Sequence, residues 1–391
     1  MLRMEDIELA DKRVLIREDL NSPVADGRVT SDERIQASLP TIRHALAAGA
    51  RLIVMAHLGR PREGEPEEAS SLQPVAEHLA ELLDQPIELA RDWIDGLPPV
   101  EAGQLVLCEN VRWLEGEKDN DPALARKMAA LCDVYVMDAF GVAHRAQAST
   151  YGVAQYAPIA CAGPLLAREV DTLKHLLDSP RRPLTAIVGG AKVSTKIGVL
   201  DALLHQVDQL IVGGGIGNTF IAAAGYSVGR SLYEPDRVPA ARRLIEAARE
   251  RGAEIPIPSD VVVATRARAD ALTAIKPVDA VDDEDMILDV GPATRARYAG
   301  LLDSAGTIFW NGPIGMFELD AFAGGTRALA DAIAASPAYS IAGGGDTLAA
   351  LRKFLMTDRM DYICTGGGAF LEFVEHRHLP AVDILEQRAH E

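Results

Sequence analysis

The chain has 391 residues, 48% of them hydrophobic and 25% charged, a composition typical of a globular protein and a length that suggests about two domains. Acidic residues outnumber basic ones by 57 to 39, and a formal net charge of −18 disfavours binding to nucleic acid or anionic membranes. No apolar stretch is long enough to span a membrane, and residues 1–6 lack the apolar core of a signal peptide. We therefore expect a cytoplasmic protein with no nucleic-acid or membrane partner.

Short apolar runs alternate with stretches of helical period along the first half. Such runs, without polar alternation, predict strands buried on both faces of a parallel sheet. The runs cover 14–16, 52–55, 105–108 and 134–137, and the helical patterns cover 72–83 and 122–131. A further helix is predicted over 165–177 as the connector between domains, because Ser179-Pro180 and Pro183 follow it.

The second half repeats this alternation. Apolar runs cover 186–188, 210–212, 261–263, 307–309, 339–341 and 362–364, with a helical pattern over 239–251. The alternation predicts βαβ units, and hence an α/β fold with two Rossmann-like, doubly wound parallel-sheet domains. The predicted limits are 1–168 for the N-terminal domain, 169–183 for the connecting helix and linker, and 184–370 for the C-terminal domain.

The four cysteines are far apart in the sequence, and three of them end or flank apolar runs. We expect them to be buried thiols rather than disulfide partners or zinc ligands. They are Cys108, Cys132, Cys161 and Cys364.

Nine of the apolar runs lead directly into polar or glycine-rich turns, at the strand ends where open α/β sheets bind ligands. The turns of the first half contain Arg, His, Asp and Asn. Arg34, Arg60, Arg112 and Arg145 are candidates for one site, because guanidinium groups bind phosphate and carboxylate in a bidentate way. The alternative is four unrelated surface arginines.

The turns of the second half are rich in glycine, which lets backbone N–H groups approach a phosphate. They lie at 189–192, 213–215, 311–313, 343–347 and 365–368. Asp346 is a candidate Mg²⁺ ligand, and the alternative is an N-cap for the helix that follows. Residues 213–218 lack the third glycine of the dinucleotide fingerprint, and residues 189–192 do not have the spacing of a Walker loop.

Lys192 and Lys196 are four residues apart and would share one face if this segment opens a helix. A lysine ammonium is a mobile point charge that suits a phosphate in motion. The alternative is a pair of exposed helix lysines.

Taken together, these turns resemble those of phosphoglycerate kinases over essentially the whole chain. The resemblance rests on motifs in the family's order: residues 17–23, 56–61, 109–112, 138–145, 189–196, 310–318, 343–347 and 365–368. It implies two domains facing a central cleft, with residues 371–391 packing back on the N-terminal domain, and a monomer. It also implies phosphoryl transfer from 1,3-bisphosphoglycerate to ADP, giving 3-phosphoglycerate and ATP, with Mg²⁺.

The resemblance also implies roles for individual residues. The expected phosphoglycerate ligands are Asp19, Leu20, Asn21, Arg34, His57, Leu58, Gly59, Arg60, Arg112 and Arg145. The expected nucleotide ligands are Lys196, Glu318, Gly344, Gly345, Asp346 and Thr347, with Asp346 on the metal. The transferring group would be stabilised by Arg34, Lys192, Gly345 and Gly368.

Some positions depart from the family's usual residues. Val is usual at Glu18 and Ser22, and Ser at Ala56, Cys364 and Phe370, while Asn, Thr and His are usual at Met137, Val142 and Gln147. The charged residues assigned to phosphate contacts are all kept, so we expect the reaction to be unchanged. Two other functions remain open: an NAD-dependent dehydrogenase, which the broken fingerprint disfavours, and a non-catalytic two-domain anion-binding protein.

Overall fold

The computed structural model describes residues 1–390, which form two compact units. Unit 1 comprises residues 1–172 and the C-terminal segment that begins at Arg377, and unit 2 comprises Leu173–His376. The division falls between Thr172 and Leu173, within helix α5 (Pro164–Asp178), whereas the predicted limits placed the end of the N-terminal domain at residue 168 and the start of the C-terminal domain at residue 184. Among these residues, no helix is both long and apolar enough to cross a membrane.

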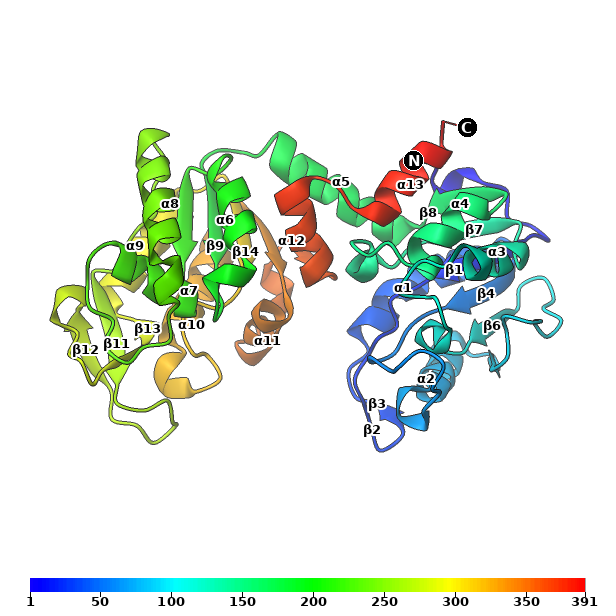
Figure 1. Ribbon diagram of the computed structural model, residues 1–391, viewed down its shortest axis with the longest axis horizontal. Helices are drawn as coiled ribbons and strands as arrows, with labels where there is room; N and C mark the ends of the chain where they lie inside the picture. The colour runs from blue at the N-terminus through cyan, green and yellow to red at the C-terminus, as the bar shows by residue number, and fades with distance from the viewer. Residues whose placement is uncertain (391) are drawn as a thin grey trace. The chain divides into compact units, whose positions relative to one another are not determined.

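Unit 1 is built on a six-stranded parallel sheet of order β5-β6-β4-β1-β7-β8 (Figure 1). Its strands are β1 (Arg13–Arg17), β4 (Arg51–Met55), β5 (Glu88–Ala90), β6 (Leu105–Cys108), β7 (Val134–Met137) and β8 (Ile159–Ala162). Its helices are α1 (Glu33–Ala47), α2 (Gln73–Leu83), α3 (Pro122–Ala130), α4 (Val153–Tyr156) and α13 (Pro380–Arg388), and β2 (Val24–Ala25) pairs with β3 (Arg28–Val29). Four predicted strands and two predicted helices of the first half are confirmed.

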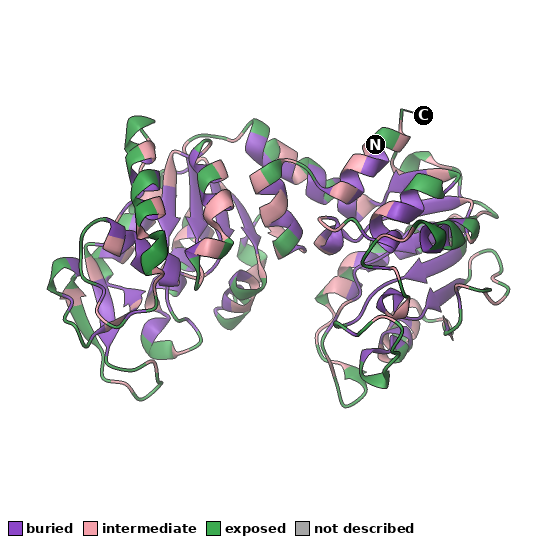
Figure 2. Ribbon diagram, in the orientation of Figure 1, coloured by how far each residue is buried: buried purple, intermediate pink, exposed green. Residues whose placement is uncertain are grey.

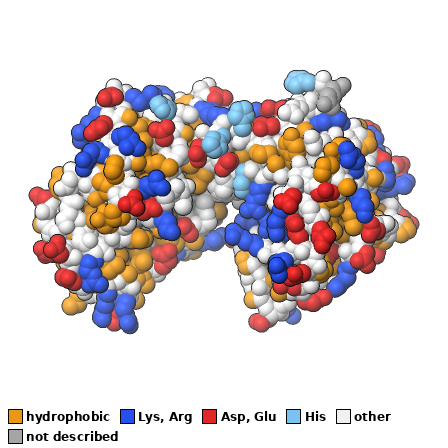
Figure 3. All heavy atoms as spheres, in the orientation of Figure 1, with side chains coloured by type: hydrophobic (Ala, Val, Ile, Leu, Met, Phe, Trp, Pro, Cys, Tyr) orange, Lys and Arg blue, Asp and Glu red, His pale blue; other side chains and the backbone are white. Residues whose placement is uncertain are grey.

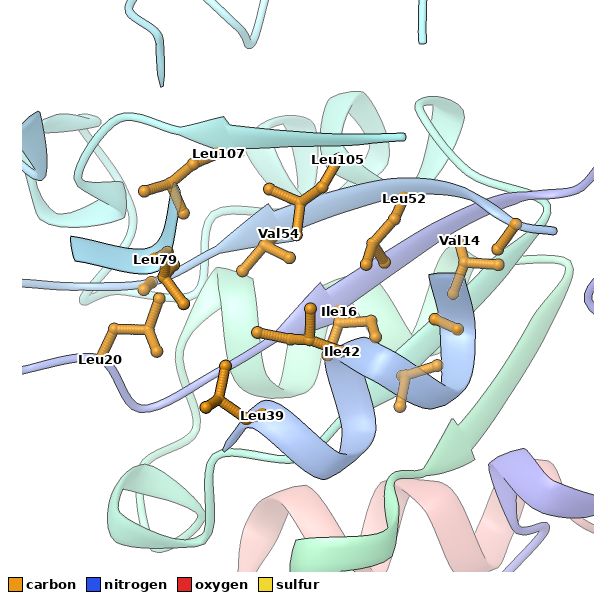
Figure 4. Close-up of a cluster of buried hydrophobic side chains, with 14 of the residues drawn as sticks. Val14, Ile16, Leu20, Leu39, Ile42, Leu52, Val54, Leu79, Leu105 and Leu107 are labelled. Atoms are coloured by element: carbon orange, nitrogen blue, oxygen red, sulfur yellow. The ribbon is translucent and has the colours of Figure 1, made fainter. Parts of the chain in front are cut away.

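One face of this sheet is covered by apolar side chains of α1 and α2. Ile16 of β1 and Val54 of β4 meet Leu39 and Ile42 of α1 in a buried apolar cluster (Figure 4). The purple strands and green outer helix faces in Figure 2 show the same pattern in each unit. Burial on both faces explains why the strands read as continuous apolar runs.

Unit 2 contains a five-stranded parallel sheet of order β10-β9-β14-β15-β16 and a smaller antiparallel sheet of order β12-β11-β13. The parallel strands are β9 (Leu184–Val188), β10 (Gln209–Val212), β14 (Thr307–Asn311), β15 (Tyr339–Gly343) and β16 (Tyr362–Cys364). The antiparallel strands are β11 (Asp260–Ala264), β12 (Ala274–Pro277) and β13 (Met286–Val290). The run at 261–263 is therefore a strand, but it lies in an antiparallel sheet.

The helices of unit 2 are α6 (Ile197–Leu204), α7 (Gly214–Ala223), α8 (Val238–Glu250), α9 (Pro292–Asp303), α10 (Gly324–Ala335), α11 (Gly345–Lys353) and α12 (Gly367–His376). Helix α12 belongs to unit 2, because it packs on α6 and places Glu375 against Gly198. The C-terminal return to unit 1 thus begins at Arg377, later than the expected residue 371. It continues into α13, where Ala381 N donates a hydrogen bond to Ala143 O.

The four cysteines are free and buried, as expected.

Candidate functional site

In unit 1 the turns that follow β1, β4, β6 and β7 lie at one edge of the sheet, because these strands are parallel. The sequence-predicted ligands of unit 1 lie in these turns, apart from Arg34, which lies in the first turn of α1. The parallel topology therefore brings residues together that are up to 126 positions apart, from Asp19 to Arg145.

Side-chain hydrogen bonds join these turns to one another. Asn21 Oδ1 accepts from Gly59 N at 2.9 Å, which links the turns after β1 and β4. Arg34 Nη1 donates to Asp19 Oδ1 and to Asn21 O, both at 3.2 Å. The Arg112 guanidinium donates to Gly59 O. These contacts assemble a polar edge from turns that are distant in the sequence.

The electrostatics of this edge are dominated by cations. Burial lowers the pKa of His57 well below its usual value, and Arg17, Arg112, Arg145 and Arg34 lower it further. Burial, followed by Arg145 and Arg17, lowers the pKa of the Arg112 guanidinium to about 10. Figure 3 shows Lys and Arg side chains gathered on the surface of unit 1. An anion bound here would relieve the repulsion between guanidinium groups, so this edge is a candidate site for a phosphorylated carboxylate.

The predicted ligands of unit 1 do not all present side chains. Leu20 has no exposed surface, and Leu58 is also buried. Figure 4 shows the Leu20 side chain among the core residues. Only the backbone of these residues is available to a ligand.

The sequence analysis missed two charged residues that lie behind this site. Arg17 is the last residue of β1, and its guanidinium lies 3.2 Å from His57 Nδ1. Glu117 is buried and binds Ser149, which in turn contacts Arg17. The sequence did contain a signal for Arg17, because an arginine that ends an apolar run lies at a position that a parallel sheet buries.

In unit 2 the glycine-rich turns are also linked to one another. Asn311 Nδ2 donates to Gly343 O at 2.9 Å, which joins the turns after β14 and β15. Ile216 N donates to Gly190 O at 3.1 Å, which joins the turns after β10 and β9. These contacts place the glycine turns around one edge of the second parallel sheet.

Two of these turns require glycine. Gly344 has φ of +97°, and a Cβ there would lie 2.9 Å from Asn311 Nδ2. A Cβ on Gly189 would lie 1.8 Å from Pro313 O. Larger residues would separate the turns, so these glycines allow the close approach that brings backbone N–H groups together.

Lys192 and Lys196 do not lie on one helix face. They flank a single 3₁₀ turn (Val193–Thr195), with Lys192 at its N-cap and Lys196 at its C-cap. Lys192 is exposed, whereas Lys196 Nζ donates to Gly189 O at 2.6 Å and to Asn311 Oδ1 at 2.8 Å. Burial lowers the pKa of Lys196 to about 8, and Asp346 partly opposes this shift. The two lysines therefore occupy different environments.

Helix α11 begins at Gly345 with Gly344 as its N-cap, and no side chain caps it. Asp346 is therefore not the N-cap, and its exposed carboxylate lies in the first turn. Thr347 is buried, and its hydroxyl accepts from Gly312 N at 2.7 Å, so its side chain holds the turn after β14.

Gly345 and Gly368 lie in the first turns of α11 and α12, where backbone N–H groups have no partner within the helix. Both are exposed. Such N–H groups and the helix dipole favour an anion. Glu318 is exposed in the segment after β14, and its backbone oxygen accepts from Lys353 Nζ.

A pocket beside these turns was not foreseen. It is lined by residues of α7, β11, β13 and the segment after β14, among them Gly217, Leu288 and Ile314, together with the polar residues Asn218 and Asp289. The isolated apolar residues that form it have no distinguishing sequence pattern.

The family model described as phosphoglycerate kinase matches residues 4–377. The chain belongs to the phosphoglycerate kinase family. The phosphoglycerate kinase of Coxiella burnetii is 56% identical, with a TM-score of 0.94 over 100% of this chain and 99% of that one. The phosphoglycerate kinase of Pyrococcus horikoshii OT3 is 31% identical, with a TM-score of 0.86 over 100% of both chains.

Membership of the phosphoglycerate kinase family makes this protein a phosphotransferase enzyme and confirms the predicted function and fold class. Neither the dehydrogenase nor the non-catalytic alternative is favoured.

The departure at Phe370 has a structural explanation. Its ring is fully buried and stacks on Phe309 of β14 with centroids 4.7 Å apart, so this position supports the core below the glycine turns.

Proposed function

We propose that this phosphoglycerate kinase binds the phosphorylated acid at the cation cluster of unit 1 and Mg·ADP or Mg·ATP at the glycine turns of unit 2. The observation that carries the proposal is the buried group of Arg17, His57 and Arg112, whose pKa values are lowered by burial or by one another. A cluster of this kind is stabilised by an anion. In 3-phosphoglycerate, both the phosphate and the carboxylate are anionic.

In this proposal the nucleotide phosphates interact with Lys196, Gly344 and the first turn of α11. Asp346 would hold Mg²⁺, which commonly takes one or two carboxylates plus phosphate oxygens and water. Within residues 1–390, no cluster of three or more metal-binding side chains occurs, which fits a metal held mainly by the nucleotide. Mg²⁺ would neutralise phosphate charge during transfer. Glu318 and Thr347 complete the assigned nucleotide ligands, Thr347 through the turn that it supports.

Phosphoryl transfer demands positive charge around the three equatorial oxygens of the moving group. We assign this role to Arg34, Lys192 and the N–H groups of Gly345 and Gly368.

A coupled assay of ATP formation from ADP and 1,3-bisphosphoglycerate tests the function. The absence of Mg²⁺-dependent ATP formation would reject it, as would thermal stabilisation by NAD but not by Mg·ADP.

Replacement of Arg112 by alanine is expected to raise the KM for 3-phosphoglycerate about 10- to 100-fold, because a lost charge-assisted contact with an unpaired partner costs about 1–3 kcal/mol. The KM for the nucleotide should change little. Steady-state kinetics with each substrate varied in turn measure both values. Arg91→Ala, at an exposed arginine paired with Glu68, is the control. An effect confined to the nucleotide KM would contradict the assignment of the two ligands.

Asp346→Asn is expected to weaken Mg·ADP binding about tenfold, or about 1.4 kcal/mol, because it removes the metal's carboxylate ligand. Stability should be unchanged, since Gly344 and not Asp346 caps α11. Titration calorimetry with ADP in the presence and absence of Mg²⁺ measures the effect, and Asp358→Asn in the same unit is the control. Equal Mg²⁺ dependence in the variant and the wild type would rule out Asp346 as a ligand.

A further inference from the structure

Arg17 is a buried cation with only 1% of its surface exposed. Its guanidinium makes three polar contacts. Nη1 donates to Glu18 O, Nε donates to Ser149 Oγ at 3.0 Å, and Nη2 lies 3.2 Å from His57 Nδ1. The third contact determines which ring nitrogen of the histidine carries the proton.

A guanidinium has N–H donors and no acceptor, so His57 Nδ1 must be the acceptor in this contact. A neutral imidazole carries its single ring proton on the other nitrogen, Nε2. The ring is neutral because it is buried and is surrounded by Arg17, Arg34, Arg112 and Arg145, which all lower its pKa. His57 therefore presents an N–H group on the side of the ring away from Arg17.

Arg17 is itself held in place by a directed chain of hydrogen bonds. Ser149 Oγ donates its only proton to Glu117 Oε1 at 2.5 Å, and Ser149 N donates to Glu117 Oε2 at 2.9 Å. The hydroxyl oxygen is then left to accept from Arg17 Nε. Ser149 lies on the short π-helix Ala148–Gly152, a form of backbone that is rare and is frequently found at functional sites.

We propose that Arg17 is a positioning residue that holds His57 as the neutral Nε2–H tautomer, so that His57 donates a hydrogen bond to an oxygen of the phosphorylated acid. The identity of the acceptor rests on the proposed function, but the tautomer does not. In this arrangement His57 is neither a cation nor a proton acceptor toward the ligand. Glu117 and Ser149 orient Arg17 from behind.

The tautomer is measured directly by long-range ¹H–¹⁵N correlation spectra of protein labelled with ¹⁵N-histidine, with the His57 signals assigned by their loss in His57→Gln. The wild type should show the neutral Nε2–H tautomer. Arg17→Met should give a mixture of the two neutral tautomers, because burial and the other arginines still lower the pKa of His57. Arg17→Lys, which keeps a donor, should retain Nε2–H. Arg13→Met, at the exposed start of the same strand, is the matched control.

Kinetics separate this inference from the function on which it rests. Arg17→Met should raise the KM for 3-phosphoglycerate about tenfold without changing that for the nucleotide, which corresponds to one lost hydrogen bond to a charged group. A changed tautomer with unchanged KM would support the positioning role but contradict phosphoglycerate as the ligand. A wild-type spectrum with Nδ1–H or protonated His57 would overturn the inference, even if Arg17→Met fails to fold. An unchanged tautomer in Arg17→Met, or in the double variant Arg17→Met/Ser149→Ala, would also overturn the inference.

Discussion

Replacement of Lys192 by methionine is expected to lower kcat about 10²- to 10³-fold, the usual cost of losing one preorganised donor to a transition state. Negative charge spreads over three oxygens as a phosphoryl group is transferred, and the protein's task is to place positive charge around them. Lys192 follows the first glycine turn of unit 2 and is exposed, with no ion-pair partner in the described part of the chain. Its ammonium is therefore available to the moving group.

Methionine preserves the length and apolar stem of Lys192, so folding and both KM values should change little. Lys196→Met should mainly raise the nucleotide KM, because Lys196 is held by Gly189 O and Asn311 within the glycine turns. Lys118→Met, at an exposed lysine of unit 1, is the control for a lost surface charge. Steady-state kinetics should give a kcat defect for Lys192→Met alone. If both lysine variants altered only the nucleotide KM, Lys192 would be a ground-state ligand.

Glu18→Gln is expected to remove a loss of stability that sets in as the pH rises above the usual glutamate pKa. Glu18 is fully buried. Burial, and then the nearby Asp138, raise the pKa of Glu18 well above its usual value, while the Ser38 hydroxyl and then Arg17 act in the opposite direction. The folded protein therefore retains a proton that the unfolded chain releases.

The sign of the effect follows from proton binding. Above the usual glutamate pKa of about 4.3 the unfolded chain loses this proton first, so stability falls by about 1.4 kcal/mol per pH unit until the folded pKa is reached. Glutamine cannot ionise and should abolish this slope. Urea unfolding of wild type and variant at pH 5, 6.5 and 8 measures it, with the exposed Glu88→Gln as control. Parallel pH dependences for wild type and Glu18→Gln would show that Glu18 does not carry the effect.

The fold class was predictable because parallel strands covered on both faces must be apolar along their length. The runs at Val14–Ile16 and Ile187–Val188 are of this kind, and both are buried strands. The common location of the candidate ligands was predictable because the carboxyl ends of such strands lie at one edge of the sheet. Asn21, Arg34 and Gly59 are indeed joined there by hydrogen bonds.

Tertiary structure decided the properties that depend on neighbours distant in sequence. Arg17 reads as an ordinary charged residue until Ser149 and His57 are placed around it. Lys196 differs from Lys192 only because Gly189 and Asn311 surround one of them. Residue types and local periodicity are encoded along the chain, whereas burial, pKa and hydrogen-bond direction arise from groups that only folding brings together.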